Sequence, residues 1–134
     1  MQLTHATAED WLQRYGEAWE HADPAAAAPL FTEDCQYFET PFSPPACGRE
    51  GVLRYWSAVH EGQADISFRF RLLAVRANTA IAHWSASFTR RASGSSVALD
   101  GVFVLEFDDR GLCRSLREWW HREEMPSSAQ AAVV

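Results

Sequence analysis

Four stretches in the C-terminal half of the chain alternate between apolar and polar residues with a period of two. Successive side chains of a strand point to opposite sides of a sheet, so this alternation predicts strands with one buried face. The stretches are residues 65–72, 82–89, 99–107 and 112–124. Turn-type residues at 93–96 separate the second stretch from the third, and those at 108–111 separate the third from the fourth. The pattern therefore predicts an antiparallel meander of four strands.

The N-terminal part of the chain shows helical spacing instead. The apolar residues at this spacing are Trp11, Leu12, Tyr15, Ala18 and Trp19. Thr7 and Asp10 resemble a capping box, which predicts a first helix that ends near Ala22. Asp23-Pro24 is a start signal for a second helix, and Pro29 is expected to cut it short because proline has no N–H.

A short strand is expected at residues 35–39, followed by a proline-rich loop at 40–45. Helical spacing returns from Gly48 to about His60, and Gly62 ends it. The apolar residues of this third helix are Val52, Leu53, Trp56 and Val59.

The length of 134 residues predicts one domain, with a core at about residues 8–124 and a flexible tail at 125–134. Helices followed by antiparallel strands are typical of an α+β fold in which helices cover one face of a curved sheet.

One carboxyl group interrupts the apolar face of the predicted sheet. In the last strand Leu116, Glu118 and Trp120 share that face, whereas Trp119 points to the other side. Burying an unpaired carboxylate costs several kcal/mol, or else its pKa rises until the group is neutral. Glu118 is therefore the first candidate for a functional residue.

Composition narrows the possible functions. The formal charge is −6 and no basic cluster opposes it, so a nucleic-acid partner is not expected. Six tryptophans and eight phenylalanines fit either an apolar cavity or a filled core. An apolar cavity would suit a flat hydrophobic ligand.

The three cysteines are Cys35, Cys47 and Cys113. Their spacing suggests neither a disulfide framework nor a zinc site, so we expect free thiols, no metal and no cofactor. No apolar run has the length of a membrane span or signal-peptide core. The sequence therefore predicts a cytoplasmic protein without a membrane partner.

The order of elements and four short motifs resemble the nuclear transport factor 2-like superfamily, in its SnoaL-like branch. The motifs are Leu30-Phe31-Thr32-Glu33-Asp34, Gly48-Arg49-Glu50, Tyr55-Trp56 and Phe107-Asp108-Asp109-Arg110-Gly111. The resemblance covers about residues 8–124. It implies a cystatin-like, cone-shaped α+β barrel with an interior pocket, and a homodimer formed through the outer sheet face. Val102, Val104, Trp119 and His83 would lie in that contact. It implies several functions, because the superfamily holds enzymes and non-catalytic modules.

Ketosteroid isomerases of this superfamily suggest two further site residues. Their oxyanion tyrosine lies in a Gln-Arg-Tyr stretch that matches Gln13-Arg14-Tyr15. Ungapped counting places their catalytic base at Glu39, whereas anchoring on the following proline places it at Thr40. The resemblance thus implies a phenol for the enolate oxygen, and a carboxylate for the proton if Glu39 is the matching residue.

A third family position departs from the pattern. In ketosteroid isomerases a protonated acid hydrogen-bonds the same oxyanion as the tyrosine. The position of that acid corresponds to Phe103 in this chain, and a phenylalanine side chain cannot donate a hydrogen bond. Glu118 could supply a protonated carboxyl in its place. Polyketide cyclases rely on an acidic residue in the late strands, which points to Glu118 or Asp100. Alternation places Asp100 and His83 on the outer face, so Glu118 is preferred.

Tyr15, Glu39 and Glu118 are therefore the candidate catalytic residues. The candidate ligand-binding walls are Trp19, Tyr37, Phe42, Trp56, Trp84, Phe103 and Trp120. His5, His21 and His60 look like terminal or helix-end residues. Two hypotheses stay open: cofactor-free acid-base catalysis of the isomerase, cyclase or dehydratase type on a carbonyl compound, or a non-catalytic binding and dimerisation module.

Overall fold

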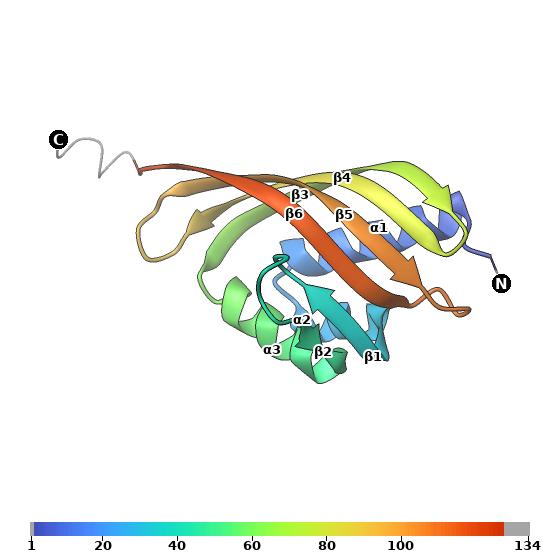
Figure 1. Ribbon diagram of the computed structural model, residues 1–134. Helices are drawn as coiled ribbons and strands as arrows, with labels where there is room; N and C mark the ends of the chain where they lie inside the picture. Colours follow the sequence, from blue (N-terminus) through green and yellow to red (C-terminus); the bar gives the residue numbers. More distant parts are fainter. Residues whose placement is uncertain (1, 128–134) are drawn as a thin grey trace.

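The computed structural model describes residues 2–127 (Figure 1). Residues 128–134, most of the predicted flexible tail, lie outside the described residues. The helices are α1 (His5–Glu20), α2 (Pro24–Ala27), the 3-10 helix η1 (Ala28–Leu30) and α3 (Gly48–His60). The strands are β1 (Phe31–Phe38), β2 (Ala46–Cys47), β3 (Gln63–Arg76), β4 (Thr79–Arg90), β5 (Ser96–Phe107) and β6 (Cys113–Met125).

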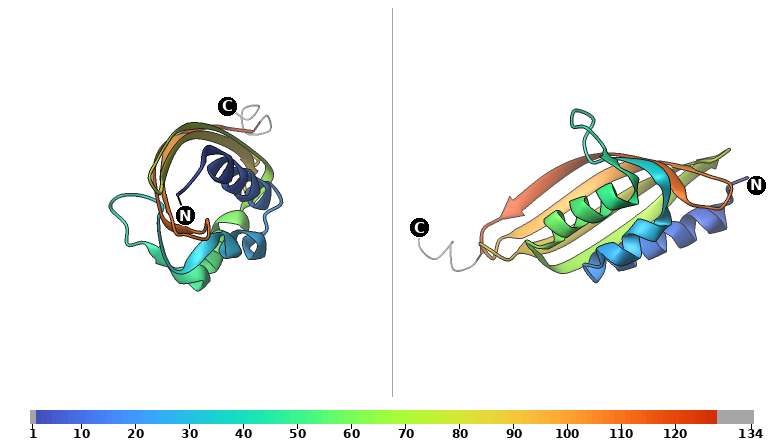
Figure 2. Two further views of the ribbon diagram at one scale, coloured as in Figure 1. Left: turned by 90° about the vertical axis from the view of Figure 1, so that its right-hand side faces the viewer. Right: turned by 90° about the horizontal axis from the view of Figure 1, so that it is seen from below.

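The six strands form one mixed sheet in the order β2-β1-β6-β5-β4-β3. Strands β3 to β6 pair antiparallel, which confirms the predicted meander, and β1 pairs parallel with β6. The sheet curls around α1 without closing (Figure 2). The α+β cone fold expected from the sequence is therefore correct.

The pairing register places the predicted apolar face on the inside of this curve. Phe103 lies between Ala82 on β4 and Glu118 on β6, and all three are buried. On the other face Asp100 is exposed and its carboxylate lies 3.0 Å from His83 Nε2. The predicted directions of Glu118, Asp100 and His83 are therefore confirmed.

Three element boundaries differ from the prediction. The first helix begins at His5 because Thr4, rather than Thr7, caps it: the Thr4 hydroxyl accepts from the backbone N–H of Thr7 at 3.1 Å. It ends at Glu20, two residues before the predicted end near Ala22. The first strand begins at Phe31 rather than at Cys35.

Leu53, expected on the apolar face of α3, is 39% exposed. The face that α3 buries carries Val52, Trp56 and His60, which follow one another at intervals of four residues. This spacing keeps the three side chains on one side of the helix.

Helix α1 packs against the inside of the sheet. Gly16 permits this contact, because a Cβ atom there would lie 2.6 Å from the ring of Phe68 on β3. Trp11 donates from Nε1 to the carbonyl of Leu30 at 2.8 Å. This bond joins the inner face of α1 to η1 and the start of β1.

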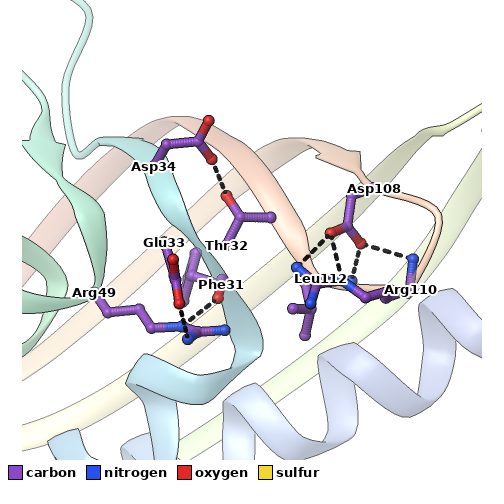
Figure 3. Close-up of polar contacts among 8 residues, drawn as sticks. All are labelled: Phe31, Thr32, Glu33, Asp34, Arg49, Asp108, Arg110 and Leu112. Atoms are coloured by element: carbon purple, nitrogen blue, oxygen red, sulfur yellow. Dashed lines mark hydrogen bonds and ion pairs between the residues drawn. The ribbon is translucent and has the colours of Figure 1, made fainter.

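Several motif residues that carry the family resemblance hold the fold together (Figure 3). Arg49 donates from Nε to the carbonyl of Phe31 at 2.8 Å and so joins α3 to β1. Asp108 accepts from the backbone N–H groups of Arg110 and Leu112, both at 2.9 Å. These bonds fix the turn between β5 and β6, far along the strand from Glu118.

Candidate functional site

A cavity of about 240 Å³ lies inside the cone, between the curved sheet and helices α1 and α3. Half of its lining residues are phenylalanine, tyrosine or tryptophan, and it includes two carboxyl groups, one just after the end of β1 and one in the middle of β6. A larger hollow of about 510 Å³ lies on the outer sheet face, where Ser67, Arg69 and Asp100 are exposed. Of these two hollows, only the interior cavity is lined by aromatic side chains of phenylalanine, tyrosine and tryptophan.

In the cavity wall, the carboxyl group of Glu118 has a pKa far from its ordinary value. Its side chain is 7% exposed, and within residues 2–127 it makes no hydrogen bond or ion pair. Burial raises the pKa of Glu118 well above its usual value, and the negative charge of Glu39 raises it further. A neutral carboxyl group can donate a hydrogen bond, which a carboxylate cannot.

Two tyrosines form a hydrogen-bonded pair beside Glu118. The hydroxyl groups of Tyr15 on α1 and Tyr37 on β1 lie 2.7 Å apart. Burial raises the pKa of both phenols, and the charge of Glu118 adds to this in each. One hydroxyl donates within the pair, so the other keeps a proton for a further acceptor.

Glu39 lies just beyond the end of β1 and also lines the cavity. It is half-buried, and its backbone carbonyl accepts from Trp120 Nε1 at 3.0 Å. Thr40 turns away: its hydroxyl donates to Ser43 at 3.0 Å, and it lines a hollow on the outside. Of the two residues considered for the base position, Glu39 is the one at the cavity.

The structure brings the three candidate catalytic residues, Tyr15, Glu39 and Glu118, to one cavity. Five of the seven predicted wall residues also line it: Trp19, Tyr37, Trp56, Trp84 and Trp120. Phe103 is fully buried and packs with Trp84 at a ring distance of 5.1 Å, without lining the cavity.

Phe42 is wrong as a wall residue. It is 97% exposed in the loop that follows β1. Residues 39–45 contain three prolines and form neither helix nor strand, so no periodicity fixes the direction of this side chain.

Eight cavity residues were not singled out as site residues from the sequence: Tyr55, Val59, His60, Gln63, Phe88, Arg90, Leu99 and Arg122. The sequence predicts His60 to be a helix-end residue with no chemical role. The spacing of His60 in the sequence could have indicated its burial, because it follows Trp56 by four residues on the buried face of α3.

Two buried nitrogen atoms of the wall have no hydrogen-bond partner within residues 2–127: His60 Nδ1 and Trp84 Nε1. Burial lowers the pKa of His60 from 6.5 to about 4, so its ring is neutral at pH 7. The ring packs edge-on against Trp56 at 4.7 Å.

Among residues 2–127, no group of three or more histidine, cysteine, aspartate or glutamate side chains is arranged to hold a metal ion. Cys35, Cys47 and Cys113 are free thiols. No helix in the described part of the chain is long and apolar enough to cross a membrane.

Residues 12–115 match the SnoaL-like domain family. None of the curated proteins compared with the chain matches it significantly.

Solved structures share the fold at low sequence identity. The epoxide hydrolase/cyclase-like enzyme SalBIII, described in pyran ring formation of salinomycin, is 17% identical over 87% of this chain and 92% of its own (TM-score 0.75). A Δ5-3-ketosteroid isomerase from Mycobacterium sp. is 14% identical over 89% of this chain and 98% of its own (TM-score 0.77).

A hypothetical protein with a ketosteroid isomerase-like fold from Catenulispora acidiphila, in complex with trimethylamine, is 13% identical over 82% of this chain and 84% of its own (TM-score 0.73). At these identities the likeness concerns the fold.

Proposed function

Because the chain belongs to the SnoaL-like domain family, we propose that its interior cavity binds a small carbonyl compound and moves a proton at the carbon beside the carbonyl. The observation that carries this proposal is the unpartnered, buried Glu118 beside the Tyr15–Tyr37 pair and near Glu39. Neighbours of the same fold include an isomerase and a cyclase-like enzyme, which supports this reaction class.

The roles follow from the two carboxyl environments. Protonated Glu118 and the free hydroxyl of the tyrosine pair donate hydrogen bonds to the carbonyl oxygen. Glu39, which solvent reaches at the cavity wall, accepts the α-proton. The electrons of the C–H bond then form the enolate, whose negative oxygen the donors stabilise.

The fate of the enolate decides the overall reaction. Return of the proton to another carbon gives isomerisation, loss of a hydroxyl group gives dehydration, and attack on a second carbonyl gives cyclisation. All three share the first proton transfer, and none needs a redox partner because no electrons leave the substrate.

The cavity also limits the size of the ligand. Its volume of about 240 Å³ is below the roughly 300–1,000 Å³ typical of sites for drug-sized molecules. A ligand of one or two rings therefore fits better than a four-ring steroid.

Exchange of α-protons for deuterium tests the proposal without knowledge of the natural substrate. We expect the protein to speed the exchange of 2-tetralone, a two-ring ketone, in D₂O above the buffer rate, as measured by proton NMR. Glu39→Gln removes the base, which is worth typically about 10²–10⁴-fold in rate. Glu50→Gln is the matched control, because Glu50 is exposed and does not line the cavity.

Two substitutions of Glu118 distinguish its possible roles. If Glu118 donates a hydrogen bond, Glu118→Gln keeps a neutral donor and loses less activity than Glu118→Leu. If Glu118 is itself the base, both variants lose all exchange. Exchange at the buffer rate for the unmodified protein would instead support a non-catalytic binding module.

A further inference from the structure

The wall of the cavity holds a polar atom that the proposed chemistry does not use. His60 Nδ1 is buried and has no partner within residues 2–127, and the His60 side chain is 7% exposed. A buried polar group without a hydrogen bond costs about 1–3 kcal/mol. The His60 ring lines the cavity but Nδ1 itself has less than 1 Å² of accessible surface, so a ligand or a water supplies the partner once the ring turns toward the cavity.

His60 lies away from the carboxyl groups. Trp56 separates it from the tyrosine pair: the Trp56 ring contacts Tyr15 at 5.1 Å and His60 at 4.7 Å, both edge-on. Along α3, His60 follows Trp56 by four residues, a rise of about 6 Å. One end of the cavity thus carries Glu118 and the tyrosines, and the other carries His60.

The floor between these ends is apolar and aromatic. Trp19 contacts the rings of both Tyr15 and His60, at 6.5 and 6.1 Å. Its indole nitrogen is already used, because Nε1 donates to Gln63 at 2.9 Å. A flat ligand can lie against the rings of Trp19 and Trp56, each of which contacts Tyr15 on one side and His60 on the other.

We propose that the ligand carries a second oxygen function, placed to hydrogen-bond His60 while its carbonyl group lies beside Glu118. The position of the carbonyl rests on the proposed function, whereas the contact with His60 rests on the unpartnered nitrogen alone. The substrate class is then a hydroxylated ketone of one or two rings, with its two oxygens on opposite ends.

A hydroxyl group fits His60 better than a charged group does. A neutral imidazole nitrogen either donates or accepts, depending on the tautomer, and a hydroxyl can do the complementary part in both cases. The pKa of about 4 keeps the ring neutral at pH 7, so it offers no charge to a carboxylate.

Calorimetric titration with two matched ketones tests the inference. We expect 6-hydroxy-2-tetralone to bind about 3- to 10-fold more tightly than 2-tetralone, the gain typical of one neutral hydrogen bond. His60→Phe, which keeps a ring against Trp56, should abolish this preference. His60→Asn, which keeps a polar atom near the position of Nδ1, should restore part of it.

His5→Phe is the matched control, since His5 is exposed and lies outside the cavity. Near-ultraviolet circular dichroism of each variant checks that the tryptophan packing is retained. Equal affinities for the two ketones, no binding of either, or a preference that survives His60→Phe would overturn the inference.

The experiment separates this inference from the proposed function. Exchange of 2-tetralone that depends on Glu39, without any preference for the hydroxylated ketone, would sustain the function and overturn the inference. A preference that depends on His60, without exchange of either ketone, would do the reverse.

Discussion

Glu118 has lost the water that normally solvates a carboxyl group. It sits on the inner face of β6 beside Phe103, and the titratable groups with which its charge interacts are Glu39 and the phenols of Tyr15, Tyr37 and Tyr55. None of these carries a positive charge that would favour the ionised form. The protein therefore keeps Glu118 protonated at pH values where a free glutamate is ionised.

This environment links the stability of the fold to pH. The folded pKa of Glu118 lies above its ordinary value of 4.5, so the native protein holds a proton that the unfolded chain has released. Stability is therefore lost as pH rises from about 4.5 through the folded pKa. Each tenfold difference in proton affinity is worth about 1.4 kcal/mol.

We expect Glu118→Gln to gain stability relative to the unmodified protein as pH is raised. The variant has no proton to lose, so its advantage in the free energy of unfolding should be larger at pH 8 than at pH 5. Urea unfolding followed by tryptophan fluorescence measures both proteins. His60 also makes stability depend on pH: because its pKa is lowered to about 4, its contribution to stability increases as pH rises from about 4 to 6.5. This contribution is the same in both proteins, so it cancels in the difference between them. A difference that stays constant with pH would contradict the argument.

Single residues of the site could be predicted where a strand fixes their direction. Alternation alone identified Glu118, because a strand has only two faces. Alternation could not predict the direction of the Phe42 side chain, because Phe42 lies in a loop. His60 was not predicted as a buried residue because histidine is polar and was not counted among the apolar residues. It nevertheless shares its four-residue spacing with Val52 and Trp56.

At the scale of elements, β5 and β6 approach each other closely at one position of the cavity wall. A Cβ atom on Gly101 would lie 2.5 Å from the carbonyl oxygen of Trp119 and 2.8 Å from Cβ of Trp120. It would also meet the ring of Trp84 at 3.0 Å. Gly101 thus leaves room for Trp84 on β4 and Trp120 on β6, which are its partners on the two neighbouring strands.

We expect Gly101→Ala to destabilise the fold by about 1–3 kcal/mol, the usual cost of an added methyl group in a close-packed site. Backbone atoms form part of the contact, so side-chain rotation cannot relieve it. Gly62→Ala provides the control, since no atom lies within 4 Å of the Cβ position there. Urea unfolding of the two variants should show a loss for the first only. Equal midpoints would mean that the strands separate easily at this position.

The motifs that make the family recognisable are mainly those that join elements. Arg49 ties α3 to β1, and Asp108 fixes the turn between β5 and β6. The fold could therefore be predicted well, whereas the ligand could not, because Tyr55 and Trp56 are the only residues of these motifs that line the cavity within the described part of the chain. The start of α1 was misplaced for a local reason: Thr4 and Thr7 can both cap, and only the structure shows which one does.

For the molecule as a whole, the outer sheet face carries an apolar stripe. Ile81 pairs with Val104 across β4 and β5, and Val102 pairs with Trp119 across β5 and β6. Ile81 and Trp119 are 37% and 46% exposed. Exposed apolar side chains that adjoin one another are typical of contact surfaces. We therefore retain the proposal that two copies pack through this face.

Sedimentation velocity tests the dimer. We expect a particle of twice 15.1 kDa for the unmodified protein, and a monomer for Ile81→Arg, because a charge buried without a partner at an apolar contact is costly. Leu53→Arg is the control: Leu53 is also apolar and exposed, at 39%, but it lies on α3. A monomer from the unmodified protein would refute the dimer, and dissociation by Leu53→Arg would move the contact to α3. The cavity lies inside the curved sheet and Ile81 is on its outer face, so we expect the Ile81→Arg monomer to keep its ligand affinity.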